Sequence, residues 1–371
     1  MAKTKVIAFY LPQFYPTKEN DEWWEPGFTE WTNVAKAKPL FKGHYQPRIP
    51  QELSFYDLRV PDVREKQAEL ARQAGIDGFC YWHYWFGNGR RLLSEVFEEV
   101  VASQKPDFPF CLCWANHSWY QKTWEPDKPN KLLMEQTYPG VEDYAAHFNA
   151  MLPAFKDQRY MRSEDGRLIF GIFEPIETPQ LNEFMAVWNK LAKENGLVGF
   201  EFFALVKGSK QLAKFKQSEF KYDRIVYDGI KDSFKIVRKN LSYEIKRLFK
   251  KIFRRPYKLT DYKDYADIAY EKFKDNPDLT PCIDPMFDHS PRSGRKAIIL
   301  HNNNPKQWGE LCKKVKELVD ARDPKDQYIF IKSWNEWGEG NYMEPDRKFG
   351  RAYINEAGKA FLSTNQAHQG D

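Results

Sequence analysis

The sequence has few cysteines and no long apolar run, and each absence argues against a class of protein. Its five cysteines are an odd number without a C-x-x-C spacing, so neither a disulfide framework nor a zinc site is indicated. A reducing cytosol fits this pattern best. A membrane-spanning helix needs about 18 or more apolar residues in a row, and no such run occurs. The cysteines are Cys80, Cys111, Cys113, Cys282 and Cys312.

An excess of one charge and a leader segment are lacking as well. Lys and Arg number 57 against 52 Asp and Glu, and the net charge of +5 is too small to indicate nucleic-acid binding. The apolar stretch that ends at Tyr10 is too short for a signal peptide, and Pro12 and Gln13 interrupt it. No G-x-G-x-x-G turn of a dinucleotide-binding fold is found. We therefore expect a cytoplasmic protein that binds no nucleic acid, no metal and no cofactor.

Secondary-structure patterns are those of repeated βα units. The chain has 371 residues, long for one ordinary domain but within the range of one α/β barrel with insertions. Short β-branched or aromatic segments alternate with helical patterns, the clearest over residues 61–74, 178–195 and 305–321. We predict strands at residues 5–11, 76–82, 109–115, 167–173, 199–206, 223–228, 281–287, 297–302 and 327–333.

These segments are one more than a barrel of eight strands needs. Either 281–287 or 297–302 lies outside the barrel, and we assign 281–287 to it because polar residues follow that segment as they follow the others. The sequence thus predicts an α/β fold over residues 1–371, a single domain formed by one (β/α)₈ TIM-type barrel.

Two stretches exceed what a minimal barrel requires. The gap from Pro12 to Val60 between the first strand and its helix is far longer than usual βα loops of about 2–6 residues. We expect this stretch to pack over the C-terminal mouth of the barrel as an extended loop. Trp23, Trp24 and Trp31 would then line a sugar subsite.

The second stretch, residues 231–255, is strongly basic. It holds ten Lys or Arg and two acids, and apolar residues recur on one face between basic ones. We predict a basic amphipathic helical insertion that contacts anionic membrane at the inner face of the plasma membrane. A barrel helix with a solvated basic face is the alternative. The apolar face comprises Ile245, Leu248, Phe249, Ile252 and Phe253.

Aromatic residues are abundant, and tryptophan occurs beside polar residues. They make up 16% of the chain, with 12 tryptophans. Tryptophan near His, Asn, Gln or Glu is typical of sugar-binding clefts, because a pyranose offers an apolar face to a ring and hydroxyls to polar neighbours. Plain core packing is the alternative. The tryptophans concerned are Trp23, Trp24, Trp31, Trp82, Trp85, Trp114, Trp119, Trp124, Trp334 and Trp337.

Polar residues follow nearly every predicted strand. Active sites of barrels form at the C-terminal strand ends, from loops of several strands. The polarity of loops in general explains some of these residues, but not their interleaving with Trp and Tyr. They are Gln13, His83, Asn116, His117, Glu174, Lys207, Asp228, Asp288, Asn335 and Glu336.

The carboxylates Glu336 and Glu339 are the catalytic candidates. Retaining cleavage of a glycosidic bond needs two carboxyl groups about 5–5.5 Å apart. Residues three apart reach that distance in a turn or helix but lie about 10 Å apart in a strand. Gly338 and Gly340 favour the turn, and crowding beside tryptophan should raise the pKa of one carboxyl group. A solvated acidic loop is the alternative.

Eight motifs together resemble one known family. They are FYLPQFY at 9–15, NDEWW at 20–24, GFTEWTN at 27–33, GHYQP at 43–47, FYDLR at 55–59, GIDGFCY at 75–81, CLCWAN at 111–116 and WNEWGEGN at 334–341. The chain resembles the WbsX-like glycosyltransferases of bacterial O-antigen and capsule clusters, from about residue 6 to 354. That family is similar to the endo-alpha-1,2-mannosidase family of glycoside hydrolases.

The resemblance implies a (β/α)₈ barrel and a retaining mechanism without metal. It assigns the removal of a proton from the substrate's own 2-hydroxyl to Glu336, which gives a 1,2-anhydro sugar. It makes Glu339 the general acid and then the general base. The implied substrate is a glycan or a lipid-linked oligosaccharide. A retaining endo-acting glycoside hydrolase and a non-catalytic glycan-binding protein are the alternatives.

Ten further residues are candidates for binding the sugar. His83 has the alternative of a satisfied core histidine, and Asp288 with Arg292 that of a structural ion pair. The chain departs from the family pattern at Phe287 and His289, and again at residues 116–119, which read NHSW. The candidates are Tyr10, Gln13, Trp31, His83, Trp114, Asn116, Asp288, Arg292, Trp334 and Asn335.

Overall fold

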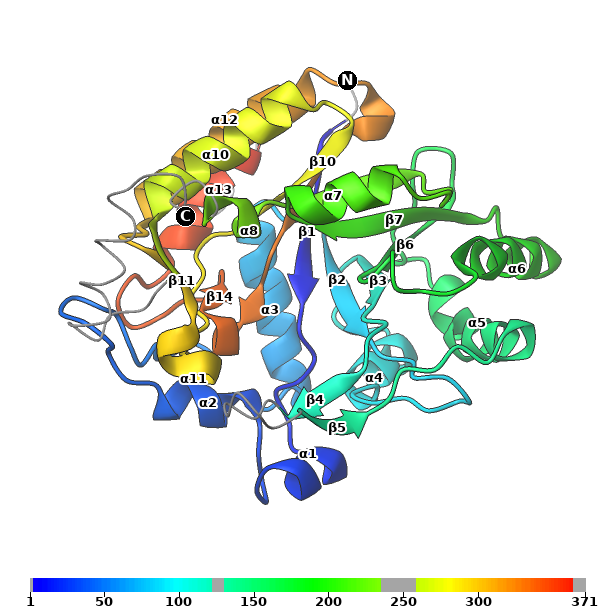
Figure 1. Cartoon of the computed structure of the whole chain (residues 1–371), viewed down its shortest axis with the longest axis horizontal. Helices are drawn as coiled ribbons and strands as arrows, with labels where there is room; N and C mark the ends of the chain where they lie inside the picture. The colour runs from blue at the N-terminus through cyan, green and yellow to red at the C-terminus, as the bar shows by residue number, and fades with distance from the viewer. Residues whose placement is uncertain (1–2, 122–129, 235–257, 363–371) are drawn as a thin grey trace.

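Eight parallel strands close into a barrel in the computed structural model, which describes residues 3–121, 130–234 and 258–362 (Figure 1). The first strand pairs with both the second and the last, which closes the ring. This confirms the predicted TIM-type barrel. Its strands are β1 (Lys5–Tyr10), β2 (Gly78–His83), β3 (Phe110–Trp114), β6 (Leu168–Ile172), β7 (Phe200–Lys207), β8 (Arg224–Asp228), β10 (Leu279–Ile283) and β12 (Tyr328–Ile331).

The extra predicted strand, residues 297–302, lies outside the barrel, as predicted. It forms β11 (Ile298–His301), which pairs with β9 (Lys258–Asp261) in a separate two-stranded sheet. The barrel strand β10 begins earlier than predicted and ends at Ile283. The next residue, Asp284, donates its backbone N–H to the hydroxyl of Tyr265 at 2.8 Å instead of continuing the strand.

Helices cover the outside of the barrel. Two of the predicted helices begin at a proline, and in α12 the side chain of Asn304 also caps the first turn by accepting from the N–H of Gln307. No helix among the described residues is both long and apolar enough to cross a membrane. The longer helices are α3 (Pro61–Gln73), α4 (Glu95–Ser103), α5 (Val141–Phe155), α6 (Leu181–Glu194), α7 (Ser209–Lys216), α10 (Tyr262–Asp275), α12 (Pro305–Asp320) and α13 (Ala352–Phe361).

The inside of the barrel is filled by aromatic side chains. The ring of Phe330 lies 5.6 Å from that of Phe9 and 4.9 Å from that of Phe203. Gly171 makes room for this packing, because a Cβ atom there would overlap the ring of Phe203. The barrel is therefore a packed core whose open surface lies at its ends.

The stretch from Pro12 to Val60 packs over the C-terminal mouth, as predicted. It contains α1 (Lys18–Trp23) and α2 (Glu30–Lys36), the blue helices on the side to which the arrow of β1 points (Figure 1). Trp23 and Trp24 line the same cavity as Glu336. Trp31 lies beneath it instead, because its ring packs 5.5 Å from that of Trp337 and its indole N–H donates to the carbonyl of Tyr56.

The basic segment is described only at its start. Residues 231–233 belong to the short helix α8 (Ile230–Ser233), and residues 235–255 lie outside the described part of the chain. The predicted amphipathic helix is therefore not tested. All five cysteines are buried and free.

Candidate active site

A cavity of about 630 Å³ opens at the C-terminal mouth of the barrel, a size typical of small-ligand sites. One side is aromatic and the other is charged. Loops after several strands supply the lining, together with the long stretch after β1 and the hairpin of β4 (Trp119–Gln121) and β5 (Lys131–Met134). The aromatic lining residues are Trp23, Trp24, Phe28, Trp82, Tyr84, Trp119, Tyr120 and Phe173.

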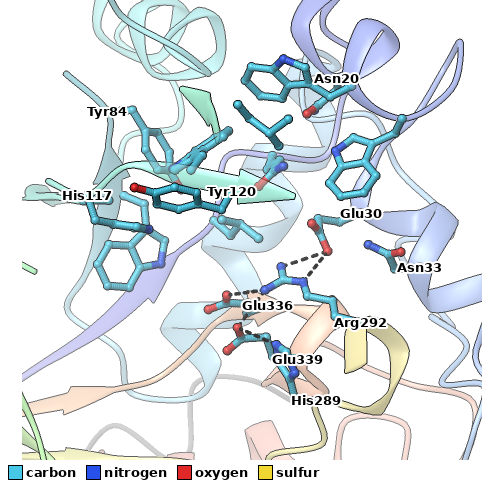
Figure 2. Close-up of a pocket in the computed structure, with 18 of the residues that line it drawn as sticks. Asn20, Glu30, Asn33, Tyr84, His117, Tyr120, His289, Arg292, Glu336 and Glu339 are labelled. Atoms are coloured by element: carbon cyan, nitrogen blue, oxygen red, sulfur yellow. Dashed lines mark hydrogen bonds and ion pairs between the residues drawn. The ribbon is translucent and has the colours of Figure 1, made fainter. Parts of the chain in front are cut away.

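Glu336 and Glu339 belong to one tight turn on the charged side. Glu336 is the cap of the 3₁₀ turn η4 (Trp337–Glu339), and side chains three residues apart in such a turn eclipse each other. Gly340 ends the turn with a φ of +53°, and a Cβ atom there would lie 2.9 Å from the Cβ of Asp288. The turn expected from the glycine pattern is present, and it directs both carboxyl groups into the cavity (Figure 2).

Hydrogen bonds fix this turn to the barrel. The side chain of Asn335 accepts from the N–H of Leu11 at 2.7 Å and donates to its carbonyl at 3.0 Å. The hydroxyl of Ser333 accepts from the N–H of Glu336 at 3.0 Å and donates to the carbonyl of Asn341 at 2.8 Å. The backbone that carries Glu336 is thereby held on both sides.

The guanidinium of Arg292 lies between three carboxylates (Figure 2). Its Nη1 donates to Glu339 Oε1 at 2.8 Å and lies 3.6 Å from Glu336 Oε1. Its Nε and Nη2 contact Glu30 Oε2 at 3.1 and 2.9 Å. Arg292 comes from the short helix α11 (Ser290–Ser293), and Glu30 from α2. One cation thus joins two loops of the barrel to the long stretch after β1.

The environment of Glu336 favours its protonated form. Burial is the main cause, the neighbouring charge of Glu339 adds to it, and together they raise the pKa of Glu336 to about 7. Arg292 and Lys332 act in the opposite direction. Lys332 lines the cavity beside the pair, and its Nζ lies 3.4 Å from Asp228 Oδ2. Glu336 therefore titrates near neutral pH.

A second buried carboxylate supports the turn from below. Glu344 accepts hydrogen bonds from the indole of Trp337 at 2.6 Å, the amide of Gln67 at 2.6 Å and the hydroxyl of Tyr56 at 2.9 Å. Trp337 also stacks on Tyr342 with ring centroids 3.7 Å apart. These contacts fix the position of the Trp337 ring under the carboxylate pair.

The opposite wall combines rings with a histidine. Trp82 stacks on Phe9 at 4.6 Å and meets Phe173 edge-on at 5.3 Å. Burial, with the nearby charge of Lys207, lowers the pKa of His117 to about 4, so that its imidazole is neutral at physiological pH. A neutral imidazole between rings suits a sugar hydroxyl, to which it can donate or from which it can accept.

Four of the twelve predicted site residues line the cavity. They are Gln13, Arg292, Glu336 and Glu339. The other eight do not line it in the described structure, which therefore does not support direct contact of these residues with a sugar. They are Tyr10, Trp31, His83, Trp114, Asn116, Asp288, Trp334 and Asn335.

The direction of each side chain explains this difference. Tyr10 is buried and donates to Gln67 of α3 at 2.7 Å. Trp114 is buried too, and its indole donates to the carbonyl of Trp85. His83 contacts His147 at 2.7 Å between the two Nε2 atoms, and burial lowers its pKa to about 3, so the alternative of a core histidine describes it better.

Asn116 and Asp288 brace loops next to the cavity. The side chain of Asn116 accepts from the N–H of Glu174 at 2.9 Å and donates to its carbonyl at 3.1 Å. Asp288 contacts His44 at 2.7 Å and accepts from Gln46 at 2.6 Å. These residues, with the buried Trp334 and Asn335, shape the site from behind its surface.

Several lining residues did not appear among the predicted ones. Glu30 and Asn33 lie in the GFTEWTN motif, Asn20 begins NDEWW, and Lys332 directly precedes SWNEWGEG. Their positions in or beside these motifs were a signal, but no spacing rule connects residue 30 with residue 292. They include Asn20, Glu30, Asn33, Tyr84, Tyr120 and Lys332.

Comparison with known proteins gives a family and a set of relatives. A family model described as "Glycosyltransferase WbsX" matches residues 6–357. A protein named WxcX from two strains of Xanthomonas campestris pv. campestris is 32% identical over 358 residues, which is 94% of this chain and 48% of WxcX. The chain thus spans about half the length of the curated relatives that it matches.

Solved structures with the same fold include sugar-active proteins. A glycoside hydrolase-like protein superposes with a TM-score of 0.59 at 14% identity, covering 97% of this chain and 94% of that protein. A GH99 endo-alpha-mannosidase from Bacteroides thetaiotaomicron superposes with a TM-score of 0.52 at 15% identity, covering 97% and 96% of the two chains. At these identities the likeness establishes the shared barrel fold.

Proposed function

Because this chain belongs to the glycosyltransferase WbsX family, we propose that it is a carbohydrate-active enzyme that transfers a glycosyl unit with retention. The product would be part of a bacterial surface polysaccharide such as O-antigen or capsule. The observation that carries the proposal is the carboxylate pair, which projects from one turn into a cavity lined on its other side by aromatic rings. Rings bind the apolar faces of sugars, and the carboxyl groups supply proton transfer.

The separation of the two carboxyl groups supports retention. Glu339 Oε1 and Glu336 Oε1 lie 2.8 and 3.6 Å from one nitrogen of Arg292. Even with that nitrogen on the line between them, the two oxygens would be closer than about 6.5 Å, where the range of inverting pairs begins.

The proposed reaction has two steps, each with its own proton transfers. Glu336 takes the proton of the donor's 2-hydroxyl, O2 attacks C1, and the bond from C1 to the leaving group breaks as Glu339 protonates the leaving oxygen. Glu339 then takes a proton from the acceptor hydroxyl, whose oxygen attacks C1; the C1–O2 bond of the anhydro sugar breaks, and Glu336 returns a proton to O2. Two inversions at C1 give net retention.

The charges of the unliganded site set a condition on these two reaction steps. A pKa of about 7 suits Glu336 as a base at neutral pH, because catalytic groups work best when their pKa lies near the working pH. Glu339 must be protonated before the first step, but the hydrogen bond from Arg292 favours its ionised form. We infer that an incoming sugar draws Arg292 away from Glu339.

The same groups serve hydrolysis if water replaces the acceptor hydroxyl. The test incubates the purified protein with nucleotide-linked and lipid-diphosphate-linked sugars, with and without an oligosaccharide acceptor. Mass spectrometry identifies a transfer product or a free sugar, and proton NMR gives its anomeric configuration. An inverted anomer would overturn the proposed mechanism, and binding of glycan without turnover under any condition would favour the glycan-binding protein.

We further propose that the acceptor is lipid-linked and that the enzyme works at the inner face of the plasma membrane. The support is the basic composition of residues 231–255. Near an anionic surface each Lys or Arg contributes about 1 kcal/mol. A variant with Lys246, Arg247, Lys250 and Lys251 changed to Glu should no longer sediment with vesicles that contain phosphatidylglycerol. Equal sedimentation of both proteins would remove this part of the proposal.

A further inference from the structure

Glu30 reaches the catalytic turn from a distant part of the sequence. It is the first residue of α2, its side chain is almost fully buried, and it contacts Arg292 through one carboxylate oxygen. The approach is possible because residue 338 is glycine. A Cβ atom at Gly338 would overlap Glu30 Oε2 and lie 3.0 Å from Arg292 Nε. The glycine between Glu336 and Glu339 thus leaves the space in which Glu30 and Arg292 meet.

Arg292 presents two different edges to its neighbours. The Nε and Nη2 edge is occupied by Glu30, so that Nη1 is left to point toward the catalytic pair (Figure 2). Nη1 lies closer to Glu339, at 2.8 Å, than to Glu336, at 3.6 Å. A guanidinium is planar, and anchoring one edge fixes the direction of the other. Glu30 therefore determines where the positive charge of Arg292 lies relative to the two glutamates.

The charged groups around the pair are few and come from several elements. His289 Nε2 lies 3.6 Å from Glu339 Oε1, and Lys332 faces both glutamates from the end of β12. Tyr84 faces Glu336 from the segment after β2. Asp228, 3.4 Å from Lys332 Nζ, and Asp284 act on the charge of Lys332 as well. Arg292 and Glu30 belong to the same set.

Resting on the proposed function, we propose that Glu30 is a positioning residue that acts through Arg292 and fixes which of the two catalytic glutamates carries the proton before substrate binds. With Glu30 in place, the guanidinium favours the ionised form of Glu339 and leaves the proton to Glu336. The long stretch after β1 thereby controls the protonation state of a turn that lies some three hundred residues further along the chain.

The sign of the effect follows from two contributions that act in the same direction. The negative charge of Glu30 itself raises the pKa of Glu336. Glu30 also shares the charge of Arg292, which would otherwise act fully on the pair. Neutralising Glu30 therefore lowers the pKa of Glu336, and a neighbouring charge of this kind changes a pKa by about one pH unit or more.

The experiment follows the carboxyl carbons of the full chain, labelled with carbon-13 at Glu Cδ, by NMR as the pH is varied without any sugar present. Loss of one signal in Glu336→Gln and of another in Glu339→Gln assigns the two groups. In Glu30→Gln we expect the midpoint of Glu336 to fall by about one pH unit. Glu30→Asp, which keeps the negative charge, should restore part of the wild-type value.

Glu25→Gln is the matched control. Glu25 lies in the same stretch and forms an ion pair with Lys36 at 2.7 Å, but both side chains are exposed and neither lines the cavity. It should leave the midpoint of Glu336 unchanged. An unchanged or higher midpoint in a folded Glu30→Gln protein would overturn the proposal. Because the titration needs no substrate, this result stands apart from the outcome of the transfer assay.

Discussion

The two ends of the barrel each hold an arginine among carboxylates, but they differ in how the carboxylates are paired. At the N-terminal end, Arg224 donates to Glu201 at 2.8 Å, to the carbonyl of Lys325 at 2.6 Å and to Thr280 at 3.3 Å. Asp326 lies 3.6 Å from it, and Arg167 lies 3.9 Å from Glu201. Arg167 is itself paired with Asp165 and Asp223 at 2.7 and 2.5 Å, so that each carboxylate there has a guanidinium beside it, an arrangement that serves stability.

At the C-terminal mouth, the single guanidinium of Arg292 is shared by Glu30, Glu336 and Glu339 beside a cavity large enough for a sugar. Lys332 is nearby, but Asp228 already pairs with it. The burial of Glu336, with the surplus of carboxylates around it as a further cause, leaves a proton on the pair near neutral pH. A carboxyl group that is buried beside a like charge at the edge of a cavity therefore indicates a site of proton transfer.

The largest effect should come from the surplus carboxylates. Glu336→Gln and Glu339→Gln should each lower the rate of glycosyl transfer by about 10²–10⁴-fold, because each removes a proton-transfer group. Thermal unfolding, followed by circular dichroism, should remain cooperative in both variants. Wild-type turnover in either variant would show that the surplus charge at the mouth has no catalytic role.

Substitution in the N-terminal cluster should instead lower the stability of the fold and leave the catalytic pair unchanged. Arg224→Met leaves the buried carboxylate of Glu201 without its main partner, and breaking such a pair costs about 3–5 kcal/mol of unfolding free energy. Urea unfolding measures the loss. The carbon-13 midpoint of Glu336 should stay at its wild-type value, since the two clusters lie at opposite ends of the barrel. A shift of that midpoint would mean that the ends are coupled.

The dependence of stability on pH should show the raised pKa of Glu336 directly. The folded-state pKa of Glu336 is raised from 4.5 to about 7, so folding favours its protonated form below that pH. This contribution is lost as the pH rises from about 4.5 through 7, and it amounts to at most about 3 kcal/mol. Glu336→Gln should therefore flatten the fall in unfolding free energy over this range. An equal slope in variant and wild type would contradict the raised pKa.

The smallest effect should come from the aromatic rim. Trp24 is 47% exposed, lines the cavity and stacks on Phe28 at 5.5 Å. Trp24→Ala in a Glu336→Gln background should weaken oligosaccharide binding by about 1 kcal/mol, measured by calorimetry, without changing the titration of Glu339. Unchanged affinity would show that Trp24 is not part of the binding surface. Val198→Ala, at an exposed residue outside the cavity, provides the control.

Much of the fold could be predicted from local pattern. The strands were found because short β-branched and aromatic runs alternate with helices that begin at proline, as at Pro61 and Pro305. The spacing of Glu336 and Glu339 around Gly338 sufficed to predict the turn. These features depend on neighbours in sequence, where periodicity and conformational preference act.

What local pattern could not supply was the direction of side chains and their distant partners. Tyr10 and Trp114 occupy strand ends in sequence, yet the pleat and the adjacent helices turn them into the packed layer. Glu30 lies 262 residues from Arg292, and only the folded long stretch brings them together. Sequence spacing carries no information about such a contact, because tertiary packing alone creates it.

The double hydrogen bond between Asn335 and Leu11 has a consequence for synthesis on the ribosome. It joins the loop after the last barrel strand to the end of the first, 324 residues apart, beside the seam where β12 pairs with β1. A nascent chain that has not yet released β12 lacks this bond and the turn it holds. The turn that carries Glu336 and Glu339 should therefore take its position only when the ring closes, late in synthesis.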